Sequence, residues 1–226
     1  MNQAICVLNF KDNTKGLIYF YTQYGKLNML GLFRNVSLQY GKLKGLHIHK
    51  CGDLSNGCES ACAHYDINNE HHGGLNSKHR HNGDLGNIEL DNNGNCQIHL
   101  VDIPLTLQEI IGRSVILHQA EDDLGKGKTR YISKLQDIND VVLGYLEENN
   151  DNICNIIMGN HELLSEDLEN VIRNDLIELR KYQKDKTINK INESKKTGNS
   201  GKRIGCGVIG YCEKKNLDEL ISKFFY

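Results

Sequence analysis

Short apolar runs recur along the first 128 residues of the chain, and Gly, Asn or Asp separates each run from the next. Runs of about six to ten residues with turn residues between them are typical of β-strands. The expected strands span 3–10, 15–23, 27–36, 41–49, 83–91, 95–103, 112–119 and 203–210. These eight runs predict an all-β protein, either an eight-stranded sandwich or a barrel.

Two stretches do not follow this pattern of short strands and turns. Residues 50–83 are rich in His, Cys and Gly and show almost no alternation, which favours a long functional loop. Residues 129–191 lose the glycines, and apolar positions at helical spacing predict helices near 131–147 and from Leu164 onward. We expect a mostly α-helical insertion, either an amphipathic hairpin packed on the β-domain or a partner-binding module. The tail at 213–226 predicts a short amphipathic helix.

The overall composition excludes several classes of protein. The 226 residues carry a formal net charge of -2, which gives no reason to expect a nucleic-acid partner. No apolar run approaches the length of a membrane span, and the first residues do not resemble a signal peptide. We therefore expect a cytoplasmic protein, in the host cytoplasm if the source is a virus.

Histidine is concentrated in one part of the chain, since seven of the ten lie between residues 47 and 81. His47 and His49 are one residue apart in an expected strand, so both project from the same face. His64 follows in the long loop, and His118 ends another strand. Imidazoles with one carboxylate suit zinc, whereas an all-imidazole set suits copper. The sequence therefore predicts ligands for two metal ions.

At this point the chain resembles the copper/zinc superoxide dismutases. The matching motifs, in order, are "GLHIH", "HHGG", "HNGDLGNI", "IIGRSVILH", "DDLGKG" and "TGNSGKRIGCGVIG". The resemblance as a whole covers residues 3–128 and 192–212. The resemblance implies an immunoglobulin-like Greek-key β-sandwich or barrel with long metal-binding and electrostatic loops. It also implies an antioxidant enzyme that converts two superoxide radicals to oxygen and hydrogen peroxide through Cu(II)/Cu(I) cycling.

The same resemblance implies roles for individual residues. The implied copper ligands are His47, His49, His64 and His118. The implied zinc ligands are His64, His72, His81 and Asp84, so that His64 bridges the two ions. Asp122 would link one copper histidine to one zinc histidine, and Cys58 and Cys206 would form a disulfide. Arg203 would draw in the anion, and Glu193, Lys196 and Thr197 would guide it.

Several histidines and cysteines fall outside these sets. We expect His71 and His79 to be exposed loop residues, because the family's ligands are the His before Gly-Gly and the His three before the Asp. His99 and His161 have no partners at ligand spacing. Most of the remaining cysteines are expected to be free thiols, with an alternative pairing or a soft metal site among Cys51, Cys58 and Cys62 left open.

The chain departs from the family at the 129–191 insertion, which falls inside the electrostatic loop. We expect one superoxide dismutase domain over 1–226, carrying this insertion and a C-terminal extension at 213–226. A homodimer is implied, with a copper chaperone as an optional partner because Arg203 lacks flanking prolines. The implied apolar contact comprises Ile5, Val7, Cys51, Gly52, Ile111, Gly112, Val208 and Tyr211. The alternative is a non-catalytic or chaperone-like metal-binding relative whose insertion binds a partner.

Overall fold

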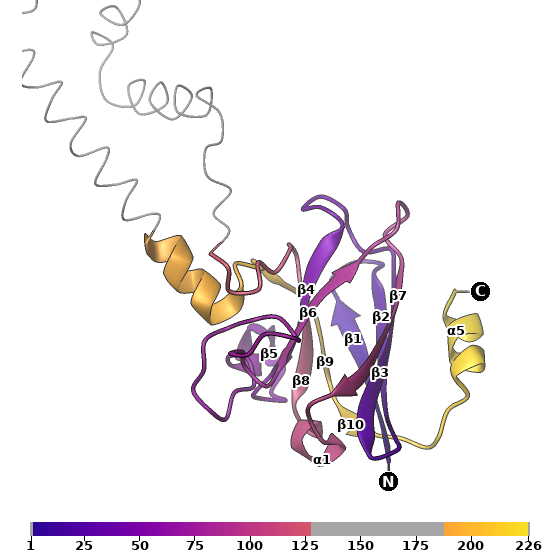
Figure 1. Ribbon diagram of the computed structural model, residues 1–226. Coiled ribbons are helices and arrows are strands. Elements are labelled where there is room, and N and C mark those ends of the chain that lie inside the picture. Colours follow the sequence, from indigo (N-terminus) through magenta and orange to yellow (C-terminus); the bar gives the residue numbers. More distant parts are fainter. Residues whose placement is uncertain (1, 128–187, 226) are drawn as a thin grey trace, which may run out of the picture. The chain divides into compact units, whose positions relative to one another are not determined.

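The computed structural model describes residues 2–127 and 188–225 (Figure 1). The chain divides into two compact units, one formed by 1–127 with 192–226 and the other by 128–191. Of the second unit, only the helical residues 188–191 belong to the described part. The predicted helices near 131–147 and from Leu164 onward, together with Cys154 and His161, lie outside the described residues.

Antiparallel strands build the first unit. In chain order they are β1 (Gln3–Phe10), β2 (Lys15–Gln23), β3 (Lys26–Arg34), β4 (Leu43–His49), β5 (Ser55–Cys58), β6 (Asp84–Glu89), β7 (Cys96–Ile103), β8 (Ser114–His118), β9 (Arg203–Val208) and β10 (Gly210–Tyr211). All eight predicted runs form strands. The short β5 and β10 are additional.

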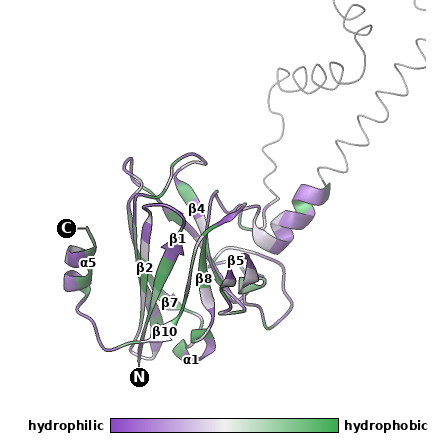
Figure 2. Cartoon of the chain, turned by 180° about the vertical axis from the view of Figure 1, so that it is seen from behind, coloured by the Kyte–Doolittle hydropathy of each residue, from purple (hydrophilic) through white to green (hydrophobic). Residues whose placement is uncertain are grey.

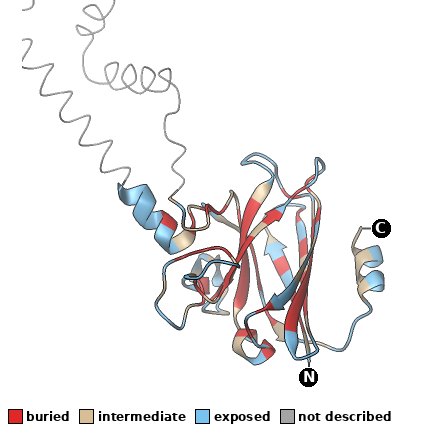
Figure 3. Ribbon diagram, viewed as in Figure 1, coloured by how far each residue is buried: buried red, intermediate tan, exposed pale blue. Residues whose placement is uncertain are grey.

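The strands curl into a nearly closed barrel with the order β6-β4-β8-β9-β1-β2-β3-β7, and β10 pairs with β1. Residues 90–95 connect β6 to β7, the two strands at the ends of this path, so the path returns toward its start. The predicted all-β, eight-stranded fold is confirmed. The barrel encloses one main core, in which Phe20, Phe33 and Ile48 are fully buried (Figure 3).

Two short helical elements follow strands or loops. The 3-10 helix η1 (Glu59–Ala61) directly follows β5. Helix α1 (Leu107–Ile110) begins after Thr106, whose hydroxyl accepts a hydrogen bond from the Glu109 backbone N–H, while the Glu109 carboxylate accepts from the Thr106 backbone. This capping box has the sequence pattern Thr-x-x-Glu, which marks the start of a helix.

The C-terminal tail forms helix α5 (Leu217–Phe225), as the sequence predicts. Its apolar side chains pack on an outer patch of the barrel around Tyr19 and Leu32, and Figure 2 shows apolar and polar faces on this helix. The Tyr19 hydroxyl accepts a 3.1 Å hydrogen bond from the Lys215 backbone N–H just before the helix. Among the described residues, no helix is both long and apolar enough to span a membrane.

Candidate metal centre

Strand alternation places the first two histidines of the site. His47 and His49 project from one face of β4, while Ile48 between them is fully buried in the core, as predicted. Strand β8 pairs with β4 and ends at His118. An isolated antiparallel bridge joins His49 to His64, which brings the long loop back against β4.

Four buried histidines converge at this point. His47, His49, His64 and His118 each offer a ring nitrogen, and these nitrogens all lie within 4.8 Å of one another. The ring of His47 is 4.1 Å from that of His64 and 4.8 Å from that of His118, measured between centroids. The four residues predicted as copper ligands therefore lie together in one cluster.

A second cluster surrounds Asp84, directly beside the first. The Nδ1 atoms of His64, His72 and His81 lie 2.8, 3.0 and 3.3 Å from Oδ1 of Asp84. The Nδ1 atoms of His64 and His81 are 3.4 Å apart. Ligands at about 2.0–2.1 Å from a tetrahedral zinc ion are separated by roughly 3.3 Å. The spacing of these four atoms therefore matches a tetrahedral set around one cation.

His47 also lies close enough to be grouped with His64, His72 and Asp84. Its two nitrogens argue for the first cluster, because Nε2 is already 2.8 Å from Oδ2 of Asp122 and only Nδ1 remains. His81, in contrast, has its Nδ1 beside both Asp84 and His64. We therefore take His81 as the fourth member of the Asp84 cluster.

Each histidine of the first cluster has one ring nitrogen without a partner. The unpartnered buried nitrogens of this cluster are Nδ1 of His47 and Nε2 of His49, His64 and His118. Buried polar atoms are nearly always paired in proteins, so four unpaired nitrogens in one place indicate a missing partner. Neutral imidazole nitrogens that face one another fit a bound metal ion.

The opposite nitrogen of these rings is held by the protein. Nδ1 of His49 donates to the Cys62 carbonyl at 3.0 Å, and Nδ1 of His118 donates to the Gly201 carbonyl at 3.0 Å. Nδ1 of His64 lies 2.8 Å from Asp84, which leaves Nε2 of the same ring for the first cluster. Such hydrogen bonds fix the tautomer and the orientation of a metal-binding imidazole. One ring, His64, therefore presents a nitrogen to each cluster.

Asp122 connects the two clusters from behind. Its Oδ2 lies 2.8 Å from Nε2 of His47, and its Oδ1 lies 2.7 Å from Nε2 of His72. The Asn87 side chain holds the Asp122 backbone at both its N–H and its carbonyl, each at 2.8 Å. The carboxylate predicted to link one histidine of each set occupies that place.

The charge states of the site follow from burial and from the two carboxylates. Burial lowers the pKa of His47, His49 and His118, the last to about 4, so these rings are neutral at pH 7. Burial also acts to lower the pKa of His72, but hydrogen bonds to Asp122 and Asp84 raise it to about 9. Burial opposes ionisation of Asp84, yet three histidine hydrogen bonds hold its pKa far below the usual range. The Asp84 cluster is thus built to neutralise positive charge.

An open cavity of about 1160 Å³ leads to the first cluster. His49, His64 and His118 line it, together with Arg203. Arg203 is fixed by backbone carbonyls, since its Nη1 donates to Cys58 at 2.8 Å and its Nη2 donates to Cys62 at 2.6 Å. The predicted guiding residues Glu193, Lys196 and Thr197 also line this cavity. The fixed guanidinium of Arg203 and the histidines of the first cluster therefore line the same cavity.

Three further histidines of the described residues lie as the sequence predicts. His71 is exposed at the edge of the cavity. His79 is exposed and pairs with Glu70, with 2.9 Å between Nδ1 and Oε2. His99 lies on β7, away from both clusters, with its Nε2 2.5 Å from the Tyr21 hydroxyl. None of these three belongs to a metal-binding group in the described part of the chain.

The cysteines require one correction. Cys58 and Cys206 form a disulfide, as the resemblance implies, and Cys6, Cys96 and Cys212 are free. Cys51 and Cys62 form a second disulfide, so the expectation of free thiols there is wrong. Of the three cysteines for which another pairing was left open, Cys51 and Cys62 pair with each other and Cys58 keeps Cys206 as its partner. Backbone hydrogen bonds between 50–51 and 61–63 bring the two sulfurs together, and sequence spacing alone does not show this pairing.

Two further residues of the site were missed by the sequence analysis. Gly198 has a φ of 68°, and a Cβ there would collide with Oδ1 of Asp122 and with Nε2 of His72. Arg80 donates from Nη1 to the carbonyls of His81, Asn82 and Asp84, and so holds the loop that carries two of the predicted zinc ligands. The Thr-Gly-Asn motif signals Gly198, whereas nothing in the pattern signals Arg80.

A β-barrel with two adjoining cation sites that share one imidazole defines a binuclear metalloprotein. One site is all-nitrogen and open to the cavity that Arg203 lines, while the other is closed and contains a carboxylate, a combination that suits copper and zinc.

Comparison with known proteins agrees with this class. Residues 14–139 match the family model for copper/zinc superoxide dismutase. The superoxide dismutase [Cu-Zn] of Paramecium bursaria Chlorella virus 1 is 32% identical over 219 residues, which covers 93% of this chain and 79% of the viral protein. Superoxide dismutase [Cu-Zn] 5 of Dictyostelium discoideum is 40% identical over 130 residues, covering 56% of this chain and 84% of that protein. The chain belongs to the copper/zinc superoxide dismutase family.

Proposed function

We propose that this chain is a superoxide dismutase that converts two superoxide radicals and two protons to oxygen and hydrogen peroxide. The observation that carries the proposal is the arrangement of His64, which offers Nε2 to one histidine cluster and Nδ1 to another beside Asp84. Membership of the family supports the same activity.

We propose specific ligand atoms for each ion. Copper would be held by Nδ1 of His47 and by Nε2 of His49, His64 and His118, the unpartnered nitrogens of the open cluster. Zinc would be held by Nδ1 of His64, His72 and His81 and by Oδ1 of Asp84. Bound copper supplies one-electron chemistry, while zinc has no redox chemistry and keeps the site in shape.

The chain's own residues would bind the substrate and supply a proton. Superoxide is a small anion, and the guanidinium of Arg203 gives it a fixed docking charge at the base of the cavity. In the reduced form of the site, Nε2 of His64 would be free of copper and would hold one proton for the peroxide product, whose second proton would come from solvent. Glu193, Lys196 and Thr197 would shape the field that guides the anion. Asp122 would fix the orientation of the His47 and His72 rings.

A direct assay tests the proposed activity. Protein loaded with copper and zinc would be compared in a stopped-flow assay of superoxide decay with the same protein loaded with zinc alone. We expect rapid decay only with the copper-containing protein. Equal decay in the two preparations would favour the non-catalytic alternative.

We propose that residues 1–226 form one superoxide dismutase domain, with an insertion at 129–191 and an extension at 213–226. The Gly127 N–H donates a 2.9 Å hydrogen bond to the Ser194 hydroxyl, so the two sides of the insertion are already joined within the first unit. A short glycine linker in place of 129–191 should therefore leave metal binding intact. A large fall in the superoxide rate of this variant would mean that the insertion aids guidance.

We also propose a homodimer that forms through the predicted apolar patch. Val7, Val208 and Tyr211 are 57%, 42% and 46% exposed although they are apolar or aromatic. Gly52 lies against Gly112 and Val208, since a Cβ built on Gly52 would be 3.4 Å from Cγ1 of Val208. Gly52, Gly112 and Val208 thus adjoin one another. Sedimentation of the wild type and of Val208→Glu should give a dimer and a monomer, and a monomeric wild type would contradict the proposal.

For the cellular setting we propose the cytoplasm, or the host cytoplasm if the source is a virus. Three of the seven described cysteines are free thiols, as a reducing compartment favours, and the two disulfides would be exceptions to the rule for that compartment. A copper chaperone would be an optional partner. Loading of the purified protein with copper salts alone would test whether the chaperone is optional.

A further inference from the structure

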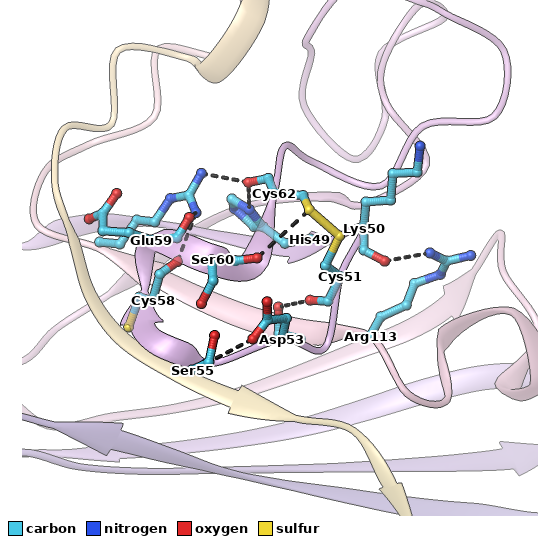
Figure 4. The surroundings of a disulfide bond; sticks show 12 residues. His49, Lys50, Cys51, Asp53, Ser55, Cys58, Glu59, Ser60, Cys62 and Arg113 are labelled. Atoms are coloured by element: carbon cyan, nitrogen blue, oxygen red, sulfur yellow. Dashed lines mark hydrogen bonds between the residues drawn. A yellow bond between two sulfur atoms is a disulfide. The ribbon is translucent and has the colours of Figure 1, made fainter.

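A second disulfide lies beside the anion-docking arginine. Cys51 and Cys62 are joined, and Cys58 and Cys206 form the other bridge. Helix η1 lies between Cys58 and Cys62, so each end of this short helix is tied to a different part of the barrel. Figure 4 shows the Cys51–Cys62 bridge with His49 close to it.

The backbone carbonyl of Cys62 has two donors. Nδ1 of His49 donates to it at 3.0 Å, and Nη2 of Arg203 donates to it at 2.6 Å. The same acceptor therefore orients one proposed copper ligand and the proposed anion-docking group. A displacement of this carbonyl would disturb both.

The backbone of Cys62 is in an unusual conformation, with φ at 67° and ψ at -154°. This region is almost restricted to glycine, because a Cβ makes it unfavourable. Such a conformation persists only where the surrounding structure enforces it. Something must therefore hold Cys62 in place, and the disulfide is the covalent restraint at that residue.

Cys51 is a firm anchor for the bridge. Its N–H donates to the Ala61 carbonyl at 3.1 Å, and its carbonyl accepts from the Ser114 hydroxyl at 2.7 Å. Arg113 donates to the carbonyl of the preceding Lys50 at 2.8 Å (Figure 4). Cys62, in contrast, is an exposed loop residue, whereas Cys51 is partly buried.

We propose that the Cys51–Cys62 disulfide is a positioning element of the active site. It holds Cys62 in its strained conformation, so that the Cys62 carbonyl fixes the His49 ring and the Arg203 guanidinium together. The part that concerns superoxide rests on the proposed function, whereas the part that concerns the order of Arg203 does not.

Two double variants separate the disulfide from the backbone conformation. Cys51→Ala/Cys62→Ala removes the bridge and keeps a Cβ at the strained position. Cys51→Ala/Cys62→Gly also removes the bridge, but glycine adopts this φ without strain. Cys212→Ala, which removes a free thiol far from the cavity, is the matched control for loss of a cysteine.

Two readouts are taken for each protein. The first is NMR detection of the guanidinium N–H signals of Arg203 in zinc-loaded, copper-free protein, which reports whether the guanidinium is held. The second is kcat/KM for superoxide in the copper- and zinc-loaded protein. We expect the alanine variant to broaden the Arg203 signals and to lose about tenfold in kcat/KM, and we expect the glycine variant to recover most of both. The control should match the wild type.

Two results would overturn the proposal. An alanine variant that equals the wild type in both readouts would show that the bridge positions nothing. A glycine variant as impaired as the alanine variant would show that the effect does not act through the conformation of residue 62. If the loaded wild type does not consume superoxide, the proposed function fails, and the NMR comparison still decides the positioning role.

Discussion

Nε2 of His72 lies 2.7 Å from Oδ1 of Asp122, and both groups are fully buried. Because the other carboxylate oxygen contacts His47, Asp122 supports a ring in each metal cluster. We expect Asp122→Ala to weaken binding of both ions by about 10- to 100-fold, since it frees the orientation of both rings. Competition with a chelator of known affinity measures the change. Glu121→Gln, one residue earlier, is the control, and a loss confined to one ion would show that Asp122 does not couple the sites.

Gly198 is predicted to be as important as a ligand, although it binds nothing. Its φ of 68° disfavours any other residue, and an added Cβ would push against Asp122 and His72. Gly198→Ala should lower the affinity for zinc while leaving the barrel folded, as measured by zinc titration and circular dichroism. Gly210→Ala, where a Cβ meets no atom within 4 Å, should bind zinc like the wild type. Equal zinc affinity in the two variants would contradict the assigned contact.

Arg203 should govern the rate and its salt dependence. Arg203→Ile removes the fixed positive charge from the cavity, so we expect kcat/KM for superoxide to fall about tenfold and to decline less with added salt. Arg203→Lys retains the charge but loses the two hydrogen bonds to the Cys58 and Cys62 carbonyls. Its kcat/KM should therefore lie between the values of the wild type and of Arg203→Ile. Rates measured over a range of ionic strength test this. A salt profile for Arg203→Ile that equals the wild type would count against the role.

The metal-free protein should lose stability in mild acid. Burial lowers the pKa of His118 to about 4 in the folded chain, whereas a histidine in the unfolded chain has a pKa of about 6.5. Between these values the unfolded state binds more protons, so the free energy of unfolding falls as the pH drops. The contribution of His72 to this pH dependence has the opposite sign, because its pKa is raised to about 9 in the folded chain. The stability that His72 contributes is therefore lost only toward alkaline pH.

Urea unfolding of the metal-free protein at several pH values between about 4 and 7 measures this slope. His118→Gln should make it shallower, because one depressed histidine is removed. A free energy of unfolding that is constant or rises toward acid would show that the buried histidines do not dominate the acid response.

Much of this architecture could be predicted from the sequence. The strands were readable because each apolar run is short and ends at Gly, Asn or Asp, and alternation along β4 places His47 and His49 on one face. The ligand set followed from motif resemblance, and the structure brings those residues together. The Cys51–Cys62 bridge could not be predicted, because it depends on the return of the loop against β4.

The roles of Arg80 and Gly198 also depend on contacts between loops distant in sequence. Arg80 looks like an ordinary exposed loop arginine until its guanidinium is seen to hold three carbonyls of the 81–84 turn. Tertiary contacts of this kind carry no local periodicity, so a pattern analysis does not detect them.

We propose that His64 serves both metal clusters and that superoxide turnover depends on it. The most direct test is the superoxide decay rate of His64→Ala after full loading with copper and zinc, with His79→Ala as the control because His79 is exposed and pairs only with Glu70 among the described residues. We predict that His64→Ala stays folded and loses most of its activity, while His79→Ala keeps it. Turnover like the wild type in a fully loaded His64→Ala protein would show that superoxide turnover does not depend on His64.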